Sequence, residues 1–142
     1  MFVCLNCERI YRQKTIKNNL CKNNNCLCEV VEIDELFVPI VLELNKKGYA
    51  TRFCCSGHLE KDLKNINSYI YFEDFAKLPN LPEGYKYDQD IYPDVDWSKW
   101  KVTNTIRRTF NSSNGINQLC KDIFENAISI LIWAEKLDVL DC

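Results

Sequence analysis

Apolar positions recur with helical spacing in two stretches of the chain. In the first, residues 33–47, apolar side chains follow one another at intervals of three or four positions, the period of one helix face. Asp34 is a suitable N-cap residue, and Gly48 stands just past the predicted end, where glycine commonly terminates a helix. Pro39 conflicts with a regular helix at this point. We therefore expect an irregular first turn or a start nearer Phe37.

The second stretch, residues 115–137, is predicted to form the longest helix. Its end is apolar nearly all round, because Ile128, Ile130, Ile132 and Trp133 fall outside the main apolar stripe. This pattern predicts deep burial or contact with a partner, including a homodimer. The main stripe, which we expect to face the core, consists of Ile116, Leu119, Cys120, Ile123, Phe124, Ala127, Leu131 and Ala134.

Three further stretches have the composition of β-strands. Residues 49–55, 68–73 and 100–110 are rich in aromatic and β-branched side chains. Residues 79–96 contain three prolines and a glycine, which indicates a loop. The sequence therefore predicts an α+β fold in which a small, mostly antiparallel sheet is covered by two helices.

Length and composition fit one compact domain with a small appendage. The chain has 142 residues, of which 46% are apolar, and a formal net charge of −2. The N-terminus has no apolar segment typical of a signal peptide, and the apolar runs are too short to span a membrane. We therefore expect a cytoplasmic protein with no membrane partner. Because cytoplasmic thiols stay reduced, the nine cysteines indicate a metal site rather than disulfides.

Five of the cysteines are concentrated in the first 28 residues. Cys4 and Cys7 form a C-x2-C pair, and Cys21 and Cys26 form a second pair. Two such pairs resemble a zinc ribbon, in which four thiolates hold one zinc ion and leave no open coordination position. The sequence predicts a zinc ribbon over residues 1–30 and an α+β domain over residues 31–142. Cys28 in place of Cys26, an iron–sulfur cluster and metal-free cysteines are the alternatives.

A short segment after the first helix, Cys55-Ser56-Gly57-His58, is the second candidate site. It ends a predicted strand, and small residues at a strand end let backbone amides approach an anion. Cys54 and Cys55 are expected on opposite faces of the strand. His58 is the single histidine of the chain. It could brace the loop by hydrogen bonding, contact a ligand, or pair with Cys55 to generate a thiolate nucleophile.

Arginines of the predicted strands could complete an anion site. Arg108 shares the apolar face of its strand and therefore needs a carboxylate or an anionic ligand, with Glu73 or Asp74 as candidate partners. Arg52 and Arg107 are expected to be exposed and able to contact phosphate. The predicted ligand-binding residues are Arg52, Cys55, Ser56, Gly57, His58, Arg107 and Arg108.

The segment LNKKGYATRFCCSGH, followed by YIYF, resembles small proteins of Firmicutes and their phages that carry an N-terminal pair of zinc knuckles and a GYxTxxCCSGH-type segment. The resemblance implies no defined activity. The same segment is distantly similar to the Cys-Ser-Gly motif of the wybutosine-synthesis methyltransferase family, which acts on tRNA. That similarity matches Cys55, Ser56 and Gly57, and the chain has His58 where an arginine is expected.

Charge and aromatic side chains are unevenly distributed. Residues 1–24 hold five basic residues against one acidic residue, whereas residues 83–96 hold five acidic residues against one lysine. Aromatic residues within and beside the acidic stretch could cover the core, anchor a protein partner or stack on a base. These residues are Tyr85, Tyr87, Tyr92, Trp97 and Trp100.

Three functions are compatible with these features. The first is a zinc-stabilised, non-catalytic module that binds a nucleotide or nucleic acid through the Cys-Ser-Gly-His segment and the arginines. The second is a phage-type interaction protein that binds a host protein through the acidic-aromatic loop or the apolar helix end. The third is an enzyme that depends on Cys55 or His58, or that is similar to the wybutosine-synthesis methyltransferases. We favour the first, although the chain has neither of the common glycine-rich phosphate loops.

Overall fold

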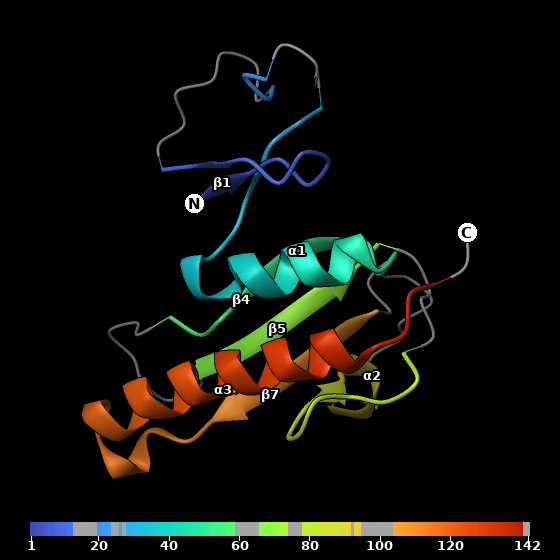
Figure 1. Ribbon diagram of the computed structural model, residues 1–142. Helices are drawn as coiled ribbons and strands as arrows, with labels where there is room; N and C mark the ends of the chain where they lie inside the picture. Colours follow the sequence, from blue (N-terminus) through green and yellow to red (C-terminus); the bar gives the residue numbers. More distant parts are fainter. Residues whose placement is uncertain are drawn as a thin grey trace.

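The computed structural model describes residues 1–12, 20–23, 26, 28–58, 66–73, 78–91, 93–94 and 104–140. Two helices lie side by side across one face of a four-stranded sheet, and a small N-terminal sheet packs on the far side of the first helix (Figure 1). The predicted α+β class is confirmed. In chain order the elements are β1 (Phe2–Val3), β2 (Ile10–Tyr11), β3 (Val31–Glu32), the 3-10 helix η2 (Glu35–Phe37), α1 (Val38–Lys46), β4 (Thr51–Cys55), β5 (Ile66–Phe72), β6 (Lys86–Tyr87), α2 (Asp88–Ile91), β7 (Thr105–Phe110), the 3-10 helix η4 (Ser112–Asn114) and α3 (Ile116–Lys136).

Every pairing between these strands is antiparallel. The N-terminal sheet has the order β2-β1-β3, and the larger sheet has the order β4-β5-β7-β6. The three predicted strands correspond to β4, β5 and β7, although residues 100–103 of the third lie outside the described part of the chain. The domain boundary at residue 30 stays a prediction, and β3, just beyond it, pairs with β1.

The start of α1 follows the prediction. The Asp34 carboxylate accepts a 3.2 Å hydrogen bond from the amide of Leu36, as an N-cap does. The first turn is the 3-10 helix η2, and regular α-helix begins at Val38 with Pro39 in its first turn. Gly48 follows the helix with a φ of +90°, a conformation that glycine adopts without a Cβ penalty.

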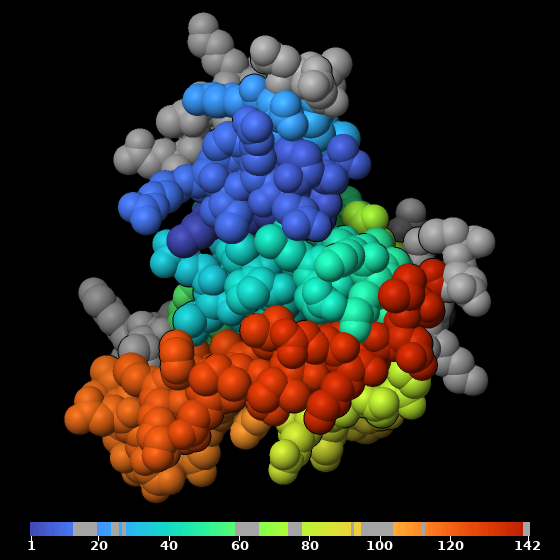
Figure 2. Space-filling view, viewed as in Figure 1, coloured from blue at the N-terminus to red at the C-terminus, as the bar shows by residue number. Residues whose placement is uncertain are grey.

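The main core lies between the four-stranded sheet and the two long helices. Its largest fully buried side chains come from α1, the segment after it, the sheet and α3, with Val3 from the N-terminal sheet. Figure 2 shows the N-terminal part packed directly against α1. A separate small cluster around Cys4, Cys21, Cys26 and Val30 occupies the N-terminal part itself. No helix in the described ranges is long and apolar enough to cross a membrane.

The orientation of α3 corrects the predicted apolar stripe. Leu119, Ile123, Ala127 and Ala134 are buried as expected, but Ile116, Cys120 and Phe124 are exposed. Ile130 and Trp133, which fall outside the predicted stripe, are buried instead. The physical reason is Asn126, only 2% exposed, whose polar side chain occupies a core position because it has buried hydrogen-bond partners.

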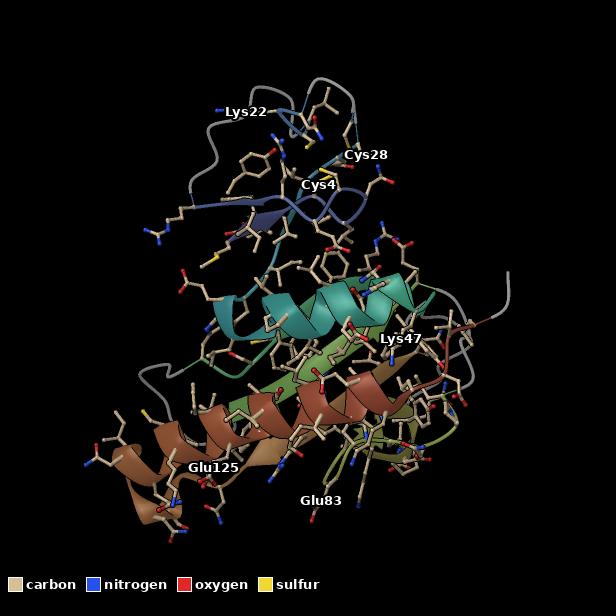
Figure 3. All side chains as sticks on the ribbon, in the orientation of Figure 1. Cys4, Lys22, Cys28, Lys47, Glu83 and Glu125 are labelled. Atoms are coloured by element: carbon tan, nitrogen blue, oxygen red, sulfur yellow. The ribbon has the colours of Figure 1, made fainter. Side chains whose placement is uncertain are left out.

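Lys47 joins the end of α1 to the end of α3. Its ammonium group donates hydrogen bonds to the carbonyl oxygens of Ala134, Glu135 and Leu137, at 3.1, 2.6 and 2.6 Å. Figure 3 places Lys47 beside the final turn of α3. Because the last carbonyls of a helix have no partners within the helix and carry partial negative charge, a lysine at this position satisfies them.

Candidate functional site

Four cysteine thiols meet in the N-terminal part, close to the label of Cys4 in Figure 3. The Sγ atoms of Cys4, Cys7, Cys21 and Cys26 all lie within 4.8 Å of one another and could hold a metal ion. Cys4 Sγ is 3.6 Å from Cys26 Sγ, and Cys7 Sγ is 3.5 Å from Cys21 Sγ. A zinc–sulfur distance of about 2.3 Å implies about 3.8 Å between the sulfur atoms of a tetrahedral site. The separations of the four thiols therefore fit a tetrahedral site of the size that zinc requires.

Hydrogen bonds to sulfur recur around this cluster. Amides two residues further along the chain contact three of the thiols: Asn6 contacts Cys4, Asn23 contacts Cys21, and Cys28 contacts Cys26. The side chain of Asn6 also donates to Cys26 Sγ at 3.4 Å, and the Tyr11 hydroxyl lies 3.1 Å from Cys21 Sγ. Such donors orient thiolates and stabilise their negative charge, as the groups around a metal site do.

Burial and hydrogen bonding act in opposite directions on these thiols. Burial raises the pKa of Cys4 to about 12. Hydrogen bonds from the Asn6 side chain and, second, from the amide of Cys28 lower the pKa of Cys26 to about 6. The hydrogen bond with Tyr11 lowers the pKa of Cys21. The local structure therefore favours thiolates, the form in which cysteine binds a metal, at two of the four positions.

Cys26, rather than Cys28, belongs to the cluster. The Cys28 thiol is exposed and is hydrogen-bonded to the Cys26 thiol, but it lies outside the group of four mutually close thiols. The Cys28 carbonyl accepts a 2.9 Å hydrogen bond from the amide of Cys21, and the Cys28 amide contacts Cys26 Sγ. Cys28 thus supports the second cysteine pair from outside the cluster.

The Cys-Ser-Gly-His segment lies at the end of β4, beside the N-cap of the helical segment that leads into α1. Ser56 donates two hydrogen bonds to one oxygen of the Asp34 carboxylate, from its hydroxyl at 2.7 Å and from its amide at 3.3 Å. His58 Nε2 lies 3.6 Å from the same oxygen. Cys54 packs against the core, and burial raises the pKa of its thiol to about 12. The Cys55 thiol lies within 4.8 Å of ligand atoms of both Asp34 and His58. Both polar donors of Ser56 are therefore directed at a carboxylate.

The two arginines of β7 are held on opposite sides of the sheet. Arg107 makes a paired contact with the buried Asp88, through Nε at 2.8 Å and Nη2 at 2.9 Å. Its side chain is 21% exposed, so the prediction of an exposed Arg107 is wrong. Arg108 donates to the side-chain oxygen of Asn126 at 3.0 Å, so an amide stands where a carboxylate was predicted. Asp74, one of the predicted partners, lies outside the described residues.

The face of the four-stranded sheet that points away from the helices carries aromatic rings and arginines. The rings of Phe53 and Tyr71 stack with centroids 5.9 Å apart and planes 17° from parallel. Arg52 lies over the Phe53 ring at 5.7 Å, and Arg107 lies over the Tyr69 ring at 5.2 Å. A hollow of about 460 Å³ is lined by Arg52, Phe53, Tyr69, Tyr71, Asp88, Thr105 and Arg107.

The predicted aromatic loop is only partly described. Tyr85 is buried, and its hydroxyl joins a network with Ser68 at 2.6 Å and Asn126 at 2.9 Å. Tyr87 packs against the main core. Tyr92, Trp97 and Trp100 lie outside the described residues. The described members of the loop thus contribute to the core rather than to an exposed binding surface.

Three residues that organise these sites could not be assigned this role from the sequence: Asp34 beside His58, Asp88 beside Arg107, and Asn126 beside Arg108. Each lies 18 to 24 positions from its partner along the chain, so no local motif connects them. The Phe53–Tyr71 stack is different, since both residues lie on strands that the sequence predicts. Side chains alternate between the two faces of a strand, so Tyr69 and Tyr71 of the predicted strand 68–73 lie on one face. This alternation was the sequence signal for aromatic rings on that face.

Comparison with known proteins places the chain in no family, since no family model matches it. It is 27% identical over 108 residues to UvrABC system protein C of Rickettsia canadensis (strain McKiel). The match covers 63% of this chain and 17% of that protein, so the chain corresponds to a small part of its length. No solved structure matches the chain.

Proposed function

We propose that this protein is a zinc-stabilised, non-catalytic binding module that recognises a phosphate-bearing ligand, a nucleotide or single-stranded nucleic acid, on the outer face of its four-stranded sheet. The observation that carries the proposal is the pair of stacked rings, Phe53 and Tyr71, with Arg52 and Arg107 lying over rings of the same face. Proteins that bind single strands combine such rings, on which bases stack, with basic groups that contact the backbone.

The geometry of the rings suits a base. Phe53 and Tyr71 are paired residues of β4 and β5, so the sheet itself fixes the spacing of the rings. Phe53 is 60% exposed, which is unusual for a phenylalanine, and a base could stack on its ring in place of the Arg52 guanidinium that now lies over it. Stacking of one base on an aromatic side chain contributes about 1–3 kcal/mol to binding. The hollow beside the rings has the size of a small-molecule site.

The charges beside the rings have different roles. Asp88 holds Arg107 in place through two hydrogen bonds, so the main contribution of this guanidinium is to support the Tyr69 ring. Arg52 and Lys86 are exposed, and Lys86 pairs with Arg107 across two neighbouring strands. These two side chains are the expected phosphate contacts.

We assign the ligand to the sheet rather than to the Cys-Ser-Gly-His segment on electrostatic grounds. An anion at that segment would need the donors of Ser56, but both already donate to the Asp34 carboxylate. The same carboxylate would repel a phosphate. Cys55, Ser56, Gly57 and His58 therefore lie outside the proposed ligand surface, and so does Arg108, which points toward α3.

Zinc is the ion that we propose for the four-cysteine cluster. Four thiolates in a tetrahedral arrangement are the ligand set of structural zinc sites, which leave no position for a substrate. Among the described residues the cluster's own core is small, with Val30 as the one buried residue other than cysteine. The ion would therefore provide much of the free energy that folds this part of the chain.

The test is binding of a fluorescently labelled single-stranded oligonucleotide and of AMP by the zinc-loaded full chain. Phe53→Ala should weaken oligonucleotide binding by about tenfold or more, as the loss of one stacked base predicts. Arg52→Ala should weaken binding and reduce its salt dependence. Phe124→Ala is the matched control, because this ring is also exposed (55%) but lies on α3. Equal effects of Phe53→Ala and Phe124→Ala, or no binding by the wild type, would contradict the proposal.

A second candidate function, contact with another protein, is favoured by the exposed row on α3. Ile116, Cys120, Phe124, Ile128 and Ile132 are all exposed and four residues apart, so each neighbours the next in a row that winds around the helix by about 40° per step. A row of this kind can pair with itself in a second copy of the chain, related by a two-fold axis. Sedimentation of the wild type and of Ile128→Glu tests this candidate: a dimer that the substitution dissociates supports it, and a monomeric wild type contradicts self-association.

A further inference from the structure

We propose that Asp34, Cys55 and His58 form a second metal site, which binds a divalent transition metal of the zinc type and leaves one coordination position open. This site shares no residue with the four-cysteine cluster or with the proposed ligand surface, although Cys55 is the cross-strand partner of Tyr69. The proposal does not depend on the function assigned to either.

Three ligand types that bind transition metals converge at this point. A carboxylate oxygen of Asp34, the Cys55 thiol and an imidazole nitrogen of His58 all lie within 4.8 Å of one another. His58 Nε2 is 3.6 Å from Asp34 Oδ2. Metal–nitrogen and metal–oxygen distances of about 2.0–2.2 Å imply about 3.4 Å between two such ligands of a tetrahedral ion. The observed separation therefore needs little adjustment to accept an ion.

The Asp34 carboxylate is already oriented by the fold. One oxygen accepts the Leu36 amide at the start of the helical segment, and the other accepts the hydroxyl and amide of Ser56. The second oxygen is also the one that faces His58. Hydrogen bonds of this kind hold a metal ligand in place and contribute to affinity. Ser56 is thus expected to act as a positioning residue and not as a ligand.

Gly57 allows the chain to bring His58 back toward Asp34. Its φ is +107°, a conformation that other residues rarely adopt. A Cβ at this position would also lie 3.0 Å from Ile66 Cγ2. The turn therefore requires glycine, and the result of the turn is that the single histidine of the chain faces a carboxylate and a thiol.

The surroundings are mainly acidic. A hollow of about 380 Å³ beside the site is lined by Asp34 and His58 together with the carboxylate residues Glu32 and Glu35, against one cation, the Met1 ammonium group, which donates to the Ile33 carbonyl. His58 is 68% exposed, so solutes can reach its imidazole. The mixed oxygen, sulfur and nitrogen set excludes Mg²⁺ and Ca²⁺, which prefer oxygen ligands, and suits Zn²⁺ or Co²⁺. With three protein ligands, the fourth position would take water or a donor group of a bound molecule.

The experiment is a titration with Co²⁺ of the reduced full chain loaded with one equivalent of zinc, followed by visible absorption, with total metal measured by native mass spectrometry. Zinc held by four thiolates exchanges slowly, so added Co²⁺ reports on the second site. The wild type should bind one Co²⁺ in addition to one zinc ion, with an absorption band from the Cys55 thiolate. His58→Gln should weaken Co²⁺ binding by at least about tenfold, and Ser56→Ala by about 10–100-fold, the usual range for a group that orients a ligand.

The controls separate this site from the others. Cys120→Ser removes an exposed thiol on α3 and should leave Co²⁺ binding unchanged. Cys7→Ser should remove the zinc ion of the four-cysteine cluster and leave the His58-dependent Co²⁺ step in place. A wild type that takes up no Co²⁺ beyond its zinc, or a His58→Gln chain that binds Co²⁺ as tightly as the wild type, would overturn the proposal. Because the His58 side chain is largely exposed, its replacement should not unfold the protein.

Discussion

The Asn126 side chain of α3 donates a 2.9 Å hydrogen bond to the Tyr85 hydroxyl in the middle of the core. The same amide group lies 3.3 Å from Ser68 Oγ, and its oxygen accepts from Arg108 at 3.0 Å. One side chain thus connects α3, β5, β7 and the segment before β6. The direction in which α3 faces the sheet depends on this polar contact as well as on its apolar residues.

Replacement of Asn126 should destabilise the protein strongly. Asn126→Ala leaves the buried Tyr85 hydroxyl and the Arg108 guanidinium without one partner each, and an unsatisfied buried polar group costs about 1–3 kcal/mol. We expect the free energy of unfolding in urea to fall by about 2–4 kcal/mol. Asn117→Ala, on the exposed side of the same helix, is the control and should change it little. Equal, small effects of the two substitutions would show that the network contributes nothing to stability.

This network also explains why the sequence predicts the existence of α3 but not its orientation. Two apolar rows run along residues 116–134, and a hydropathy pattern cannot decide between them. The buried row includes an asparagine, which such a pattern assigns to the surface. Only the polar partners on β5 and near β6, distant in sequence, make Asn126 suitable for the core.

Other features of the fold could be predicted from residues that are close together in the sequence. The N-cap at Asp34, the glycine after α1 and the two cysteine pairs depend on residues within one or two turns, and the structure places them as the sequence predicts. The partners of Arg107 and Arg108 depend on which strands become neighbours. The spacing of residues along the chain does not show which strands become neighbours. The predicted anion site therefore combined residues that lie apart in the folded protein.

Removal of the Lys47 charge should loosen the contact between α1 and α3. Lys47→Met keeps the length of the side chain but removes the donors to three carbonyls at the end of α3. Hydrogen bonds from a charged group typically contribute about 1.5–3 kcal/mol, and we expect a loss of about 1–2 kcal/mol in the free energy of unfolding because the site is partly exposed to water. The control is Lys46→Met, one residue earlier and exposed. Faster amide exchange in the last turn of α3 should accompany the loss only in Lys47→Met.

The choice between Cys26 and Cys28 as the fourth ligand can be tested directly. Cys26→Ser should reduce zinc affinity by orders of magnitude, because a hydroxyl replaces a thiolate that lies 3.6 Å from Cys4 Sγ. Cys28→Ser should retain zinc, since the Cys28 thiol lies outside the group of four mutually close thiols and a serine keeps the backbone groups that contact Cys21 and Cys26. Zinc content after dialysis against a moderate chelator gives the answer. Retention of zinc by Cys26→Ser with loss in Cys28→Ser would reverse the assignment.

Removal of zinc should unfold the N-terminal part and spare most of the remaining structure. The four-cysteine cluster has its own small core, whereas α1, α3 and the larger sheet share the main core. With EDTA, amides of β1 and β2 should exchange rapidly while those of β5 and α3 remain protected. Val3 belongs to the main core, so the midpoint of thermal unfolding should also decrease. Unchanged exchange in β1 and β2 would mean that this part is stable without a metal.

The central claim is that the outer face of the sheet binds a base and its phosphate. The most direct measurement is a ¹H–¹⁵N NMR titration of the zinc-loaded protein with a short single-stranded oligonucleotide. We expect saturable shifts that concentrate on β4, β5 and β7 around Phe53, Tyr69 and Arg107, and that need at least about tenfold more ligand to saturate in Phe53→Ala. Shifts confined to α3 or to the N-terminal part, or no shifts at millimolar ligand, would contradict it.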